Sequence, residues 1–139
     1  MKIMIDTNII ISAVLFPHGR VAHALIKALQ PPYEPLLCDY IVDELHRKFL
    51  EKFPARYEEL CSFLSTIREL VCIVPTPTQE VLEEQKIRDP KDRPILRAAI
   101  NEHAELFLTG DKDFLEAAVS DPRILSVSEF LSLQEPFLT

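Results

Sequence analysis

No hydrophobic run in the sequence is long enough to cross a membrane. The longest apolar stretch, residues 9–16, is interrupted by Ser12 and is far shorter than the roughly 20 residues that a membrane-spanning helix requires. The first residues also differ from a signal peptide, because Asp6 interrupts their apolar run and no small-residue cleavage site follows. We therefore expect a cytoplasmic protein.

Cysteine and histidine are too few and too scattered to indicate a zinc site. The cysteines, Cys38, Cys61 and Cys72, are odd in number and form neither a CxxC pair nor a disulfide framework, so we expect them to be reduced. The four histidines form no HExxH or H-x3-H pair. His18 and His23 are five positions apart, which does not place them on the same face of a helix. This pattern argues against zinc.

Glycine is scarce, with two residues, whereas proline occurs 11 times and marks most of the expected breaks between elements. The sequence contains no internal repeat, no low-complexity segment and no linker long enough to separate two domains. Its 139 residues, 47% of them hydrophobic and 27% charged, have the usual size and mixture of one globular domain. We therefore expect a single domain over residues 1–139.

Positive charge is in deficit, because the formal net charge is −7. A protein that holds nucleic acid by electrostatics alone is expected to be basic. The objection weakens if several carboxylates bind metal, since each divalent ion contributes two positive charges where a substrate phosphate would lie.

Short apolar runs alternate with segments of helical periodicity along the chain. We expect strands at residues 2–5, 34–38, 70–74, 106–109 and 124–127, and helices at residues 20–30, 39–53, 55–69, 79–86, 92–103 and 113–119, with a last helical turn from Ser128. Asp39 is the expected N-cap of its helix. The alternation predicts an α/β fold, with a central parallel sheet of about five strands covered by helices on both faces.

Two aspartates follow expected strands directly. Asp6 comes after the first strand, and Asp111 follows the fourth through Thr109 and Gly110. Ligands of open parallel sheets bind beyond the carboxyl ends of the strands, so both residues lie where a site is expected. Taken alone, either residue could equally be an aspartate of a turn or a helix cap.

Two further acids can reach the same edge of the sheet. Asp92 precedes Ile95, Leu96 and Ala99, which places its carboxylate on the apolar side of the expected helix, where it needs a partner or a metal. The alternative is that Asp92 only caps this helix. Glu44 lies one turn into the helix after the second strand, although a glutamate there is often simply solvated.

The four acids lie in motifs that follow one another along the chain. These are Ile5-Asp6-Thr7-Asn8, Ile41-Val42-Asp43-Glu44-Leu45, Asp89-Pro90-Lys91-Asp92 before an Ile-Leu-x-Ala-Ala helix, and Leu108-Thr109-Gly110-Asp111-Lys112-Asp113-Phe114. In this order, and over essentially the whole chain, they resemble the PIN-domain nucleases. Residues 12–19 further resemble a segment of the PIN-domain proteins that serve as toxins of toxin–antitoxin pairs.

The resemblance implies an acidic site that binds metal and cleaves RNA. The catalytic and metal-binding residues would be Asp6, Glu44, Asp92 and Asp111, with Asn8 and Asp113 as supporting polar groups. The resemblance also implies that the first strand lies in the middle of the sheet beside the fourth. It further implies products with 5′-phosphate and 3′-hydroxyl ends, a possible antitoxin partner and a possible homodimer. Because the ligands are all oxygen, the residues themselves favour Mg²⁺ or Mn²⁺.

Positive residues flank the expected site on two sides. The candidates for RNA contact are Arg47, Lys48, Lys52, Arg56, Lys91 and Arg93, and Lys86, Arg88 and Arg97 also lie along the approach to Asp92. Each of them could instead be a solvated surface charge. The aromatic residues Phe49, Phe53, Tyr57 and Phe63 could form a dimer surface or belong to the core.

Three other functions compete with a nuclease as interpretations of this sequence. A phosphotransferase of the haloacid-dehalogenase type needs an aspartate two residues after the first, where this chain has Asn8. A response-regulator receiver needs a phosphoacceptor aspartate after the third strand, where Val74-Pro75-Thr76 supplies none. The remaining alternative is a non-catalytic PIN-like scaffold that binds RNA or protein.

Overall fold

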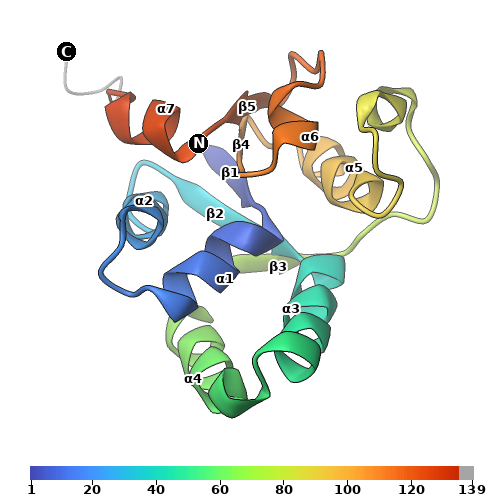
Figure 1. Ribbon diagram of the computed structural model, residues 1–139. Helices are drawn as coiled ribbons and strands as arrows, with labels where there is room; N and C mark the ends of the chain where they lie inside the picture. Colours follow the sequence, from blue (N-terminus) through green and yellow to red (C-terminus); the bar gives the residue numbers. More distant parts are fainter. Residues whose placement is uncertain (135–139) are drawn as a thin grey trace.

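A parallel sheet forms the centre of the protein (Figure 1). The computed structural model describes residues 1–134 of the chain. The strands are β1 (Lys2–Ile5), β2 (Glu34–Cys38), β3 (Cys72–Val74), β4 (Leu106–Leu108) and β5 (Arg123–Leu125). They are all parallel and lie in the order β3-β2-β1-β4-β5, which confirms the predicted sheet with β1 in the middle beside β4.

Helices cover both faces of this sheet. They are α1 (Thr7–Leu15), α2 (Arg20–Ala28), α3 (Asp39–Lys52), α4 (Tyr57–Ile67), α5 (Arg93–Asn101), α6 (Lys112–Leu115) and α7 (Val127–Ser132), together with the 3-10 turns η1 (Pro54–Arg56) and η2 (Leu82–Lys86). The central strands are buried on both sides: Ile3, Met4 and Ile5 of β1 are fully buried, as is Phe107 of β4. This burial explains why they read as continuous apolar runs rather than alternating ones.

Helix α1 was not predicted from the sequence. Its buried residues Ile9, Ile10, Ala13 and Val14 share one side of the helix. The other side carries the apolar residues Ile11 and Leu15, so the sequence lacks the one-sided pattern of a surface helix. The helix begins at Thr7 because the preceding Asp6 side chain accepts a hydrogen bond from the Thr7 N–H.

One predicted N-cap and one predicted helix start were wrong. Asp39 is the first residue of α3 rather than its N-cap, and its Oδ1 accepts hydrogen bonds from the Thr76 N–H at 3.1 Å and hydroxyl at 2.6 Å. Asp39 therefore ties the end of β3 to α3. The last helix is capped by Ser126, which forms a reciprocal capping box with Glu129, and does not start at Ser128.

The aromatic residues between α3 and α4 belong to the core. Phe49 is fully buried, and Phe53, Tyr57 and Phe63 are partly buried against the core. They do not form an exposed apolar face. Cys38 is buried, Cys61 and Cys72 are exposed, and all three are free thiols. Across residues 1–134, no helix combines the length and the apolar character that a membrane crossing needs.

Candidate functional site

The pairing of β1 with β4 brings Asp6 beside the loop that contains Asp111. Ile5 is in register with Leu108, and the Asp6 N–H continues the ladder by donating to the Leu108 carbonyl at 3.0 Å. Asp6 is 4% exposed. Its Oδ1 accepts from the Thr7 N–H at 2.8 Å, and its Oδ2 accepts from the Thr109 hydroxyl at 2.6 Å. Both carboxylate oxygens of Asp6 are thus held by groups that follow a strand.

Thr109 connects Asp6 with Asp111. It is fully buried, and its hydroxyl oxygen accepts the Asp111 N–H at 2.9 Å while the same hydroxyl donates to Asp6. Asp111 is the N-cap of α6, and its Oδ1 accepts the Asp113 N–H at 2.9 Å. Asn8 braces the same loop, because its Oδ1 accepts the Gly110 N–H at 3.4 Å.

Asp92 reaches this group from the start of α5. It occupies the N-cap position of the helix, but its side chain makes no capping hydrogen bond. The loop before it is fixed by the Tyr40 hydroxyl of α3, which donates to the Lys91 carbonyl at 2.5 Å, and by an Asp89 Oδ1 that accepts the Lys91 N–H at 3.0 Å. Asp89 therefore shapes the turn and does not cap the helix. The carboxylate of Asp92 remains available to bind a ligand.

Glu44 lies on α3 at the edge of the cluster and is 6% exposed. The Thr7 hydroxyl donates a short hydrogen bond to Glu44 Oε1. Lys48 Nζ lies 3.8 Å from Glu44 Oε2, and Arg47 Nη2 lies 4.0 Å from the same oxygen. The neighbouring acid on this helix, Asp43, is exposed.

Two of the aspartates carry strongly raised pKa values. Burial is the main reason that the pKa of Asp6 rises to about 6, and the charges of Asp111 and Glu44 raise it further against the hydrogen bonds from Thr109 and Thr7. Burial also raises the pKa of Asp92 to about 7, followed by repulsion from Asp6 and Asp111. Carboxylates that are buried together and lack a compensating cation are typical of functional sites.

The residues present fit a hard divalent cation. One carboxylate oxygen each from Asp92, Asp111 and Asp113 can lie within 4.8 Å of the others. Oxygen donors are the ligands that Mg²⁺ and Mn²⁺ prefer, and two positive charges would relieve the repulsion that raises the pKa of Asp92. Asp6 and Glu44 are not part of this closest group, although their charges act on Asp92.

The predicted RNA-contact residues fall into two kinds. Arg56 supports the fold, because it pairs with Glu59 at 2.7 Å and its guanidinium also reaches the carbonyls of Val14 and Leu15 at 3.4 Å. Arg93 donates to the Ile87 carbonyl at 2.9 Å. The exposed residues are Arg47, Lys52 and Lys91, with Lys48 half-buried. Arg47 and Lys48 lie on the Glu44 side of the cluster, and Lys91 lies directly before Asp92.

Two participating residues, Thr7 and Thr109, were given no site role from the sequence, and both position carboxylates. Arg88, which was expected along the approach to Asp92, forms an ion pair with Asp113 at 2.8 Å. The available signal was the position of each threonine, directly after Asp6 and two residues before Asp111. A buried hydroxyl next to a site acid is well placed to orient it.

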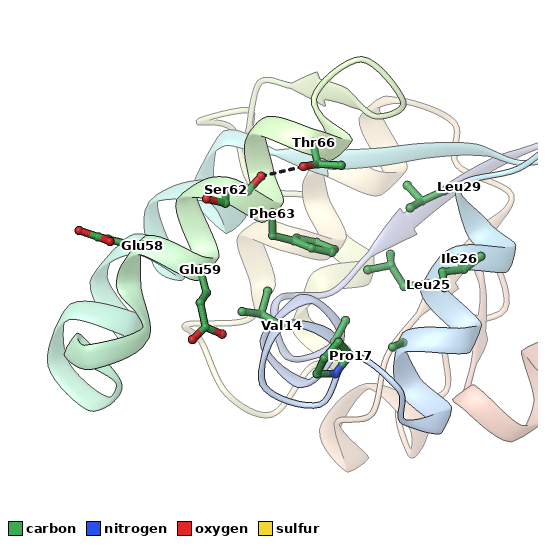
Figure 2. Close-up of a pocket in the computed structure, with 12 residues that line it drawn as sticks. Val14, Pro17, Leu25, Ile26, Leu29, Glu58, Glu59, Ser62, Phe63 and Thr66 are labelled. Carbon is green, nitrogen blue, oxygen red and sulfur yellow. Dashed lines mark hydrogen bonds between the residues drawn. The ribbon is translucent and has the colours of Figure 1, made fainter.

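A separate apolar groove lies between α1, α2 and α4, with a volume of about 580 Å³ (Figure 2). Figure 2 shows Leu25 and Ile26 of α2 on one side and Phe63 of α4 on the other, with Glu58 and Glu59 along the outer part of α4. Ile26 is 50% exposed. The groove meets α1 at its carboxyl-terminal half, whereas Asp6 lies at the amino-terminal end of that helix.

Comparison with known proteins identifies one family. A family model described as PIN domain matches residues 2–113 of this chain. No curated protein matches the sequence significantly.

Solved structures with the same fold share little sequence with this chain. One such structure is VapBC2 from Rickettsia felis bound to a DNA fragment from its promoter. A chain of it superposes with a TM-score of 0.68 and 18% identity, over 91% of this chain and 98% of that chain. DNA-bound VapBC from Salmonella typhimurium gives 0.66 and 15%, with the same coverage. FitAcB from Neisseria gonorrhoeae gives 0.65 and 22% over 91% of this chain and 98% of that chain.

Proposed function

The chain belongs to the PIN-domain family, and from that membership we propose that it is a metal-dependent endoribonuclease that hydrolyses phosphodiester bonds of RNA. The observation that carries the proposal is the convergence of Asp92, Asp111 and Asp113 within 4.8 Å, beside the buried Asp6 and Glu44. A cluster of this kind is costly for the fold, since burial and mutual repulsion raise two of its pKa values. A bound cation would offset the repulsion between these carboxylates, which gives a reason for the protein to bury them together.

The roles of the residues follow from their contacts. Asp92, Asp111 and Asp113 would hold Mg²⁺ or Mn²⁺, with Asp6 and Glu44 completing the acidic site. A divalent ion supplies positive charge at the phosphate and activates water for in-line attack. Thr109 fixes the direction of Asp6 and the backbone before Asp111, and Thr7 fixes Glu44. Hydrolysis of the bond to the 3′ oxygen would leave 5′-phosphate and 3′-hydroxyl ends.

The exposed cations near the site would hold the RNA backbone. Lys91 directly precedes Asp92, and Arg47 and Lys48 flank Glu44. Phosphate contacts from such residues give affinity without sequence preference. They provide local positive charge on a protein whose net charge of −7 would otherwise repel nucleic acid.

We further propose that the protein is the toxin of a toxin–antitoxin pair and that its antitoxin binds the groove between α1, α2 and α4. The groove offers apolar contacts from Leu25, Ile26 and Phe63, with the acids Glu58 and Glu59 along one side. An amphipathic helix with apolar anchors and a basic residue facing Glu58 complements this surface in shape and charge, whereas Glu59 is already paired with Arg56. The structural similarity to chains of VapBC and FitAcB supports the same assembly.

Cleavage of a generic single-stranded RNA tests the enzymatic proposal directly. The wild-type protein should cut RNA in Mn²⁺ and stop when EDTA is added, while DNA of the same sequence should be cut far more slowly. Asp92→Asn, purified in parallel, is the matched control, because a contaminating nuclease would accompany both proteins. Equal cleavage by wild type and Asp92→Asn, or cleavage that persists in EDTA, would contradict the proposal. Absence of cleavage by the wild type would favour a non-catalytic scaffold.

A further inference from the structure

One arginine contacts the group of three aspartates. Arg88 lies in the loop between η2 and α5, and its Nη2 is 2.8 Å from Asp113 Oδ1. Asp113 is one of the three residues whose carboxylate oxygens approach within 4.8 Å. Within residues 1–134, no other ion pair involves Asp92, Asp111 or Asp113. A positive charge of the chain therefore lies beside the proposed metal site.

The environment of Arg88 differs from that of an arginine that stabilises the fold. Arg97 is 12% exposed and binds Glu84 through Nε at 2.8 Å and Nη2 at 2.7 Å, with Nη1 on the Pro77 carbonyl at 2.8 Å. Arg88 is 85% exposed, and the ion pair with Asp113 is its one side-chain contact of this kind within the described chain. The Arg88 side of this pair is open to solvent while Asp113 is 20% exposed, and ion pairs with an exposed partner contribute little to stability, so the contact can be exchanged at little cost.

Asp113 cannot keep its ion pair with Arg88 unchanged while it coordinates a divalent ion. An ion held by the three aspartates would neutralise Asp113 and repel the guanidinium beside it. The guanidinium would then lie next to the place where a phosphate of the substrate meets the ion. Its planar donors match phosphate in a bidentate arrangement.

We propose that Arg88 is a substrate-positioning residue. When a divalent ion binds Asp113, Arg88 leaves Asp113 and contacts a phosphate of the RNA instead. The phosphate half of this inference rests on the proposed function. The competition for Asp113 does not, because it concerns only the binding of a cation to the protein.

Mn²⁺ titration by electron paramagnetic resonance tests the competition without any substrate. Arg88→Ala should bind Mn²⁺ about twofold to fivefold more tightly than wild type, as expected for removing one exposed charge pair. Arg68→Ala is the matched control, because Arg68 is an exposed arginine at the end of α4. It should bind Mn²⁺ like wild type.

RNA kinetics test the phosphate contact. Arg88→Ala should raise KM about tenfold with kcat nearly unchanged, because loss of a contact made equally in the ground and transition states affects KM. The log–log salt slope of RNA binding should fall by about 0.7, the value for one lost contact to a single strand. Arg88→Lys keeps the positive charge but lacks the planar guanidinium, so its KM and salt slope should lie between those of wild type and Arg88→Ala.

The outcomes separate this inference from the enzymatic proposal. An active wild type with unchanged KM and salt slope in Arg88→Ala would overturn the phosphate role and leave the ribonuclease proposal intact. Weaker Mn²⁺ binding by Arg88→Ala would overturn the exchange, since Arg88 would then hold Asp113 in place for the ion. A wild type that cuts no RNA would overturn the ribonuclease and the phosphate role together, while the Mn²⁺ titration would still decide the competition.

Discussion

The Thr109 hydroxyl donates to Asp6 Oδ2 at 2.6 Å, across the boundary between β4 and β1. These two residues are 103 positions apart in the sequence, and both are almost fully buried. The same hydroxyl accepts the Asp111 N–H at 2.9 Å. One side chain therefore orients the Asp6 carboxylate and fixes the backbone of Asp111.

Replacing Thr109 by valine should separate this positioning role from simple packing. Valine has nearly the same shape, so it leaves no cavity but removes the donor to Asp6 and the acceptor for Asp111. Loss of such an outer partner typically reduces metal affinity or activity about 10- to 100-fold. Leaving buried polar groups unpaired should also cost about 1–3 kcal/mol of stability. Thr109→Ser should restore both, and a Thr109→Val variant with wild-type Mn²⁺ affinity would contradict the role.

Asp92→Asn should stabilise the protein in EDTA while abolishing cleavage. The pKa of Asp92 is raised from 3.8 to about 7, so the neutral carboxyl is favoured by folding. The stability that the neutral Asp92 carboxyl contributes is fully present below the unfolded pKa and is lost as the pH rises through about 7. After allowance for solvent screening, we expect the asparagine to gain about 1–2 kcal/mol at pH 8, with the difference shrinking as pH falls.

Thermal melts of wild type and Asp92→Asn between about pH 8 and pH 5 measure this effect. Asp6→Asn should behave in the same direction, because the pKa of Asp6 is raised to about 6. Its gain in stability should be partly offset, because Thr109 and Thr7 donate to both oxygens of the Asp6 carboxylate and an asparagine can accept only one of these hydrogen bonds with its side-chain oxygen. A variant that loses stability in EDTA would contradict the repulsion argument for its residue, and a variant that still cuts RNA would exclude its residue from the catalytic site.

Mn²⁺ should stabilise wild type much more than Asp92→Asn. A ligand that binds only the native state raises its stability by mass action, about 2.7 kcal/mol at a concentration of 100 times Kd. The ligand atoms must be ionised, so Mn²⁺ affinity should fall as pH drops below about 7, the pKa of Asp92. Melting curves at several Mn²⁺ concentrations and two pH values measure both effects. Equal stabilisation of the two proteins would place the ion elsewhere.

The cations named from the sequence should divide into RNA contacts and structural residues. Lys91→Ala should weaken RNA binding and reduce its log–log salt slope by about 0.7, with melting temperature unchanged. Arg56→Ala should instead lower the melting temperature, because Arg56 holds Glu59 and the carbonyls at the end of α1. Binding and melting data on both variants decide the assignment. An unchanged slope for Lys91→Ala would remove it from the interface.

The edge of the sheet where the acids gather was predictable from the sequence, whereas the position of β1 beside β4 was implied only by the resemblance to a known family. Asp6 and Asp111 each follow a buried apolar strand, and parallel strands end at the same edge. Helix α1 was not predictable from periodicity, since the apolar Ile11 and Leu15 lie on the side opposite the buried Ile9. The capping role of Asp39 was also misjudged, because its carboxylate binds Thr76, a residue 37 positions away.

Side-chain geometry within the site could not be predicted in the same way. The Thr109 contact with Asp6 depends on the register Ile5–Leu108, and no local pattern specifies that register. Arg88 lies in an irregular loop, so its direction depends on how that loop packs beside α6. Sequence order can indicate which acids converge, but hydroxyl and guanidinium partners depend on the completed fold.

The last prediction concerns the buried pair that anchors the segment before the Asp92 loop. Glu84 is fully buried, and its oxygens accept from Arg97 at 2.7 and 2.8 Å and from the Val81 N–H at 2.7 Å. Arg97→Met should cost about 3–5 kcal/mol, because it leaves a buried carboxylate without its cation. Adding Glu84→Gln should recover part of this loss.

Arg97 lowers the pKa of Glu84, so the pair stabilises the protein above the unfolded pKa of a glutamate and loses this effect as pH falls through the lower folded value. The difference in free energy of unfolding between wild type and Arg97→Met should therefore shrink as the pH falls. The free energy of unfolding of the double variant should depend less on pH. Denaturant unfolding of the wild type, both single variants and the double variant measures the coupling. Additive effects of the two substitutions would show that Glu84 and Arg97 stabilise the segment independently, since coupled partners give a double variant that is more stable than the sum of the single losses predicts.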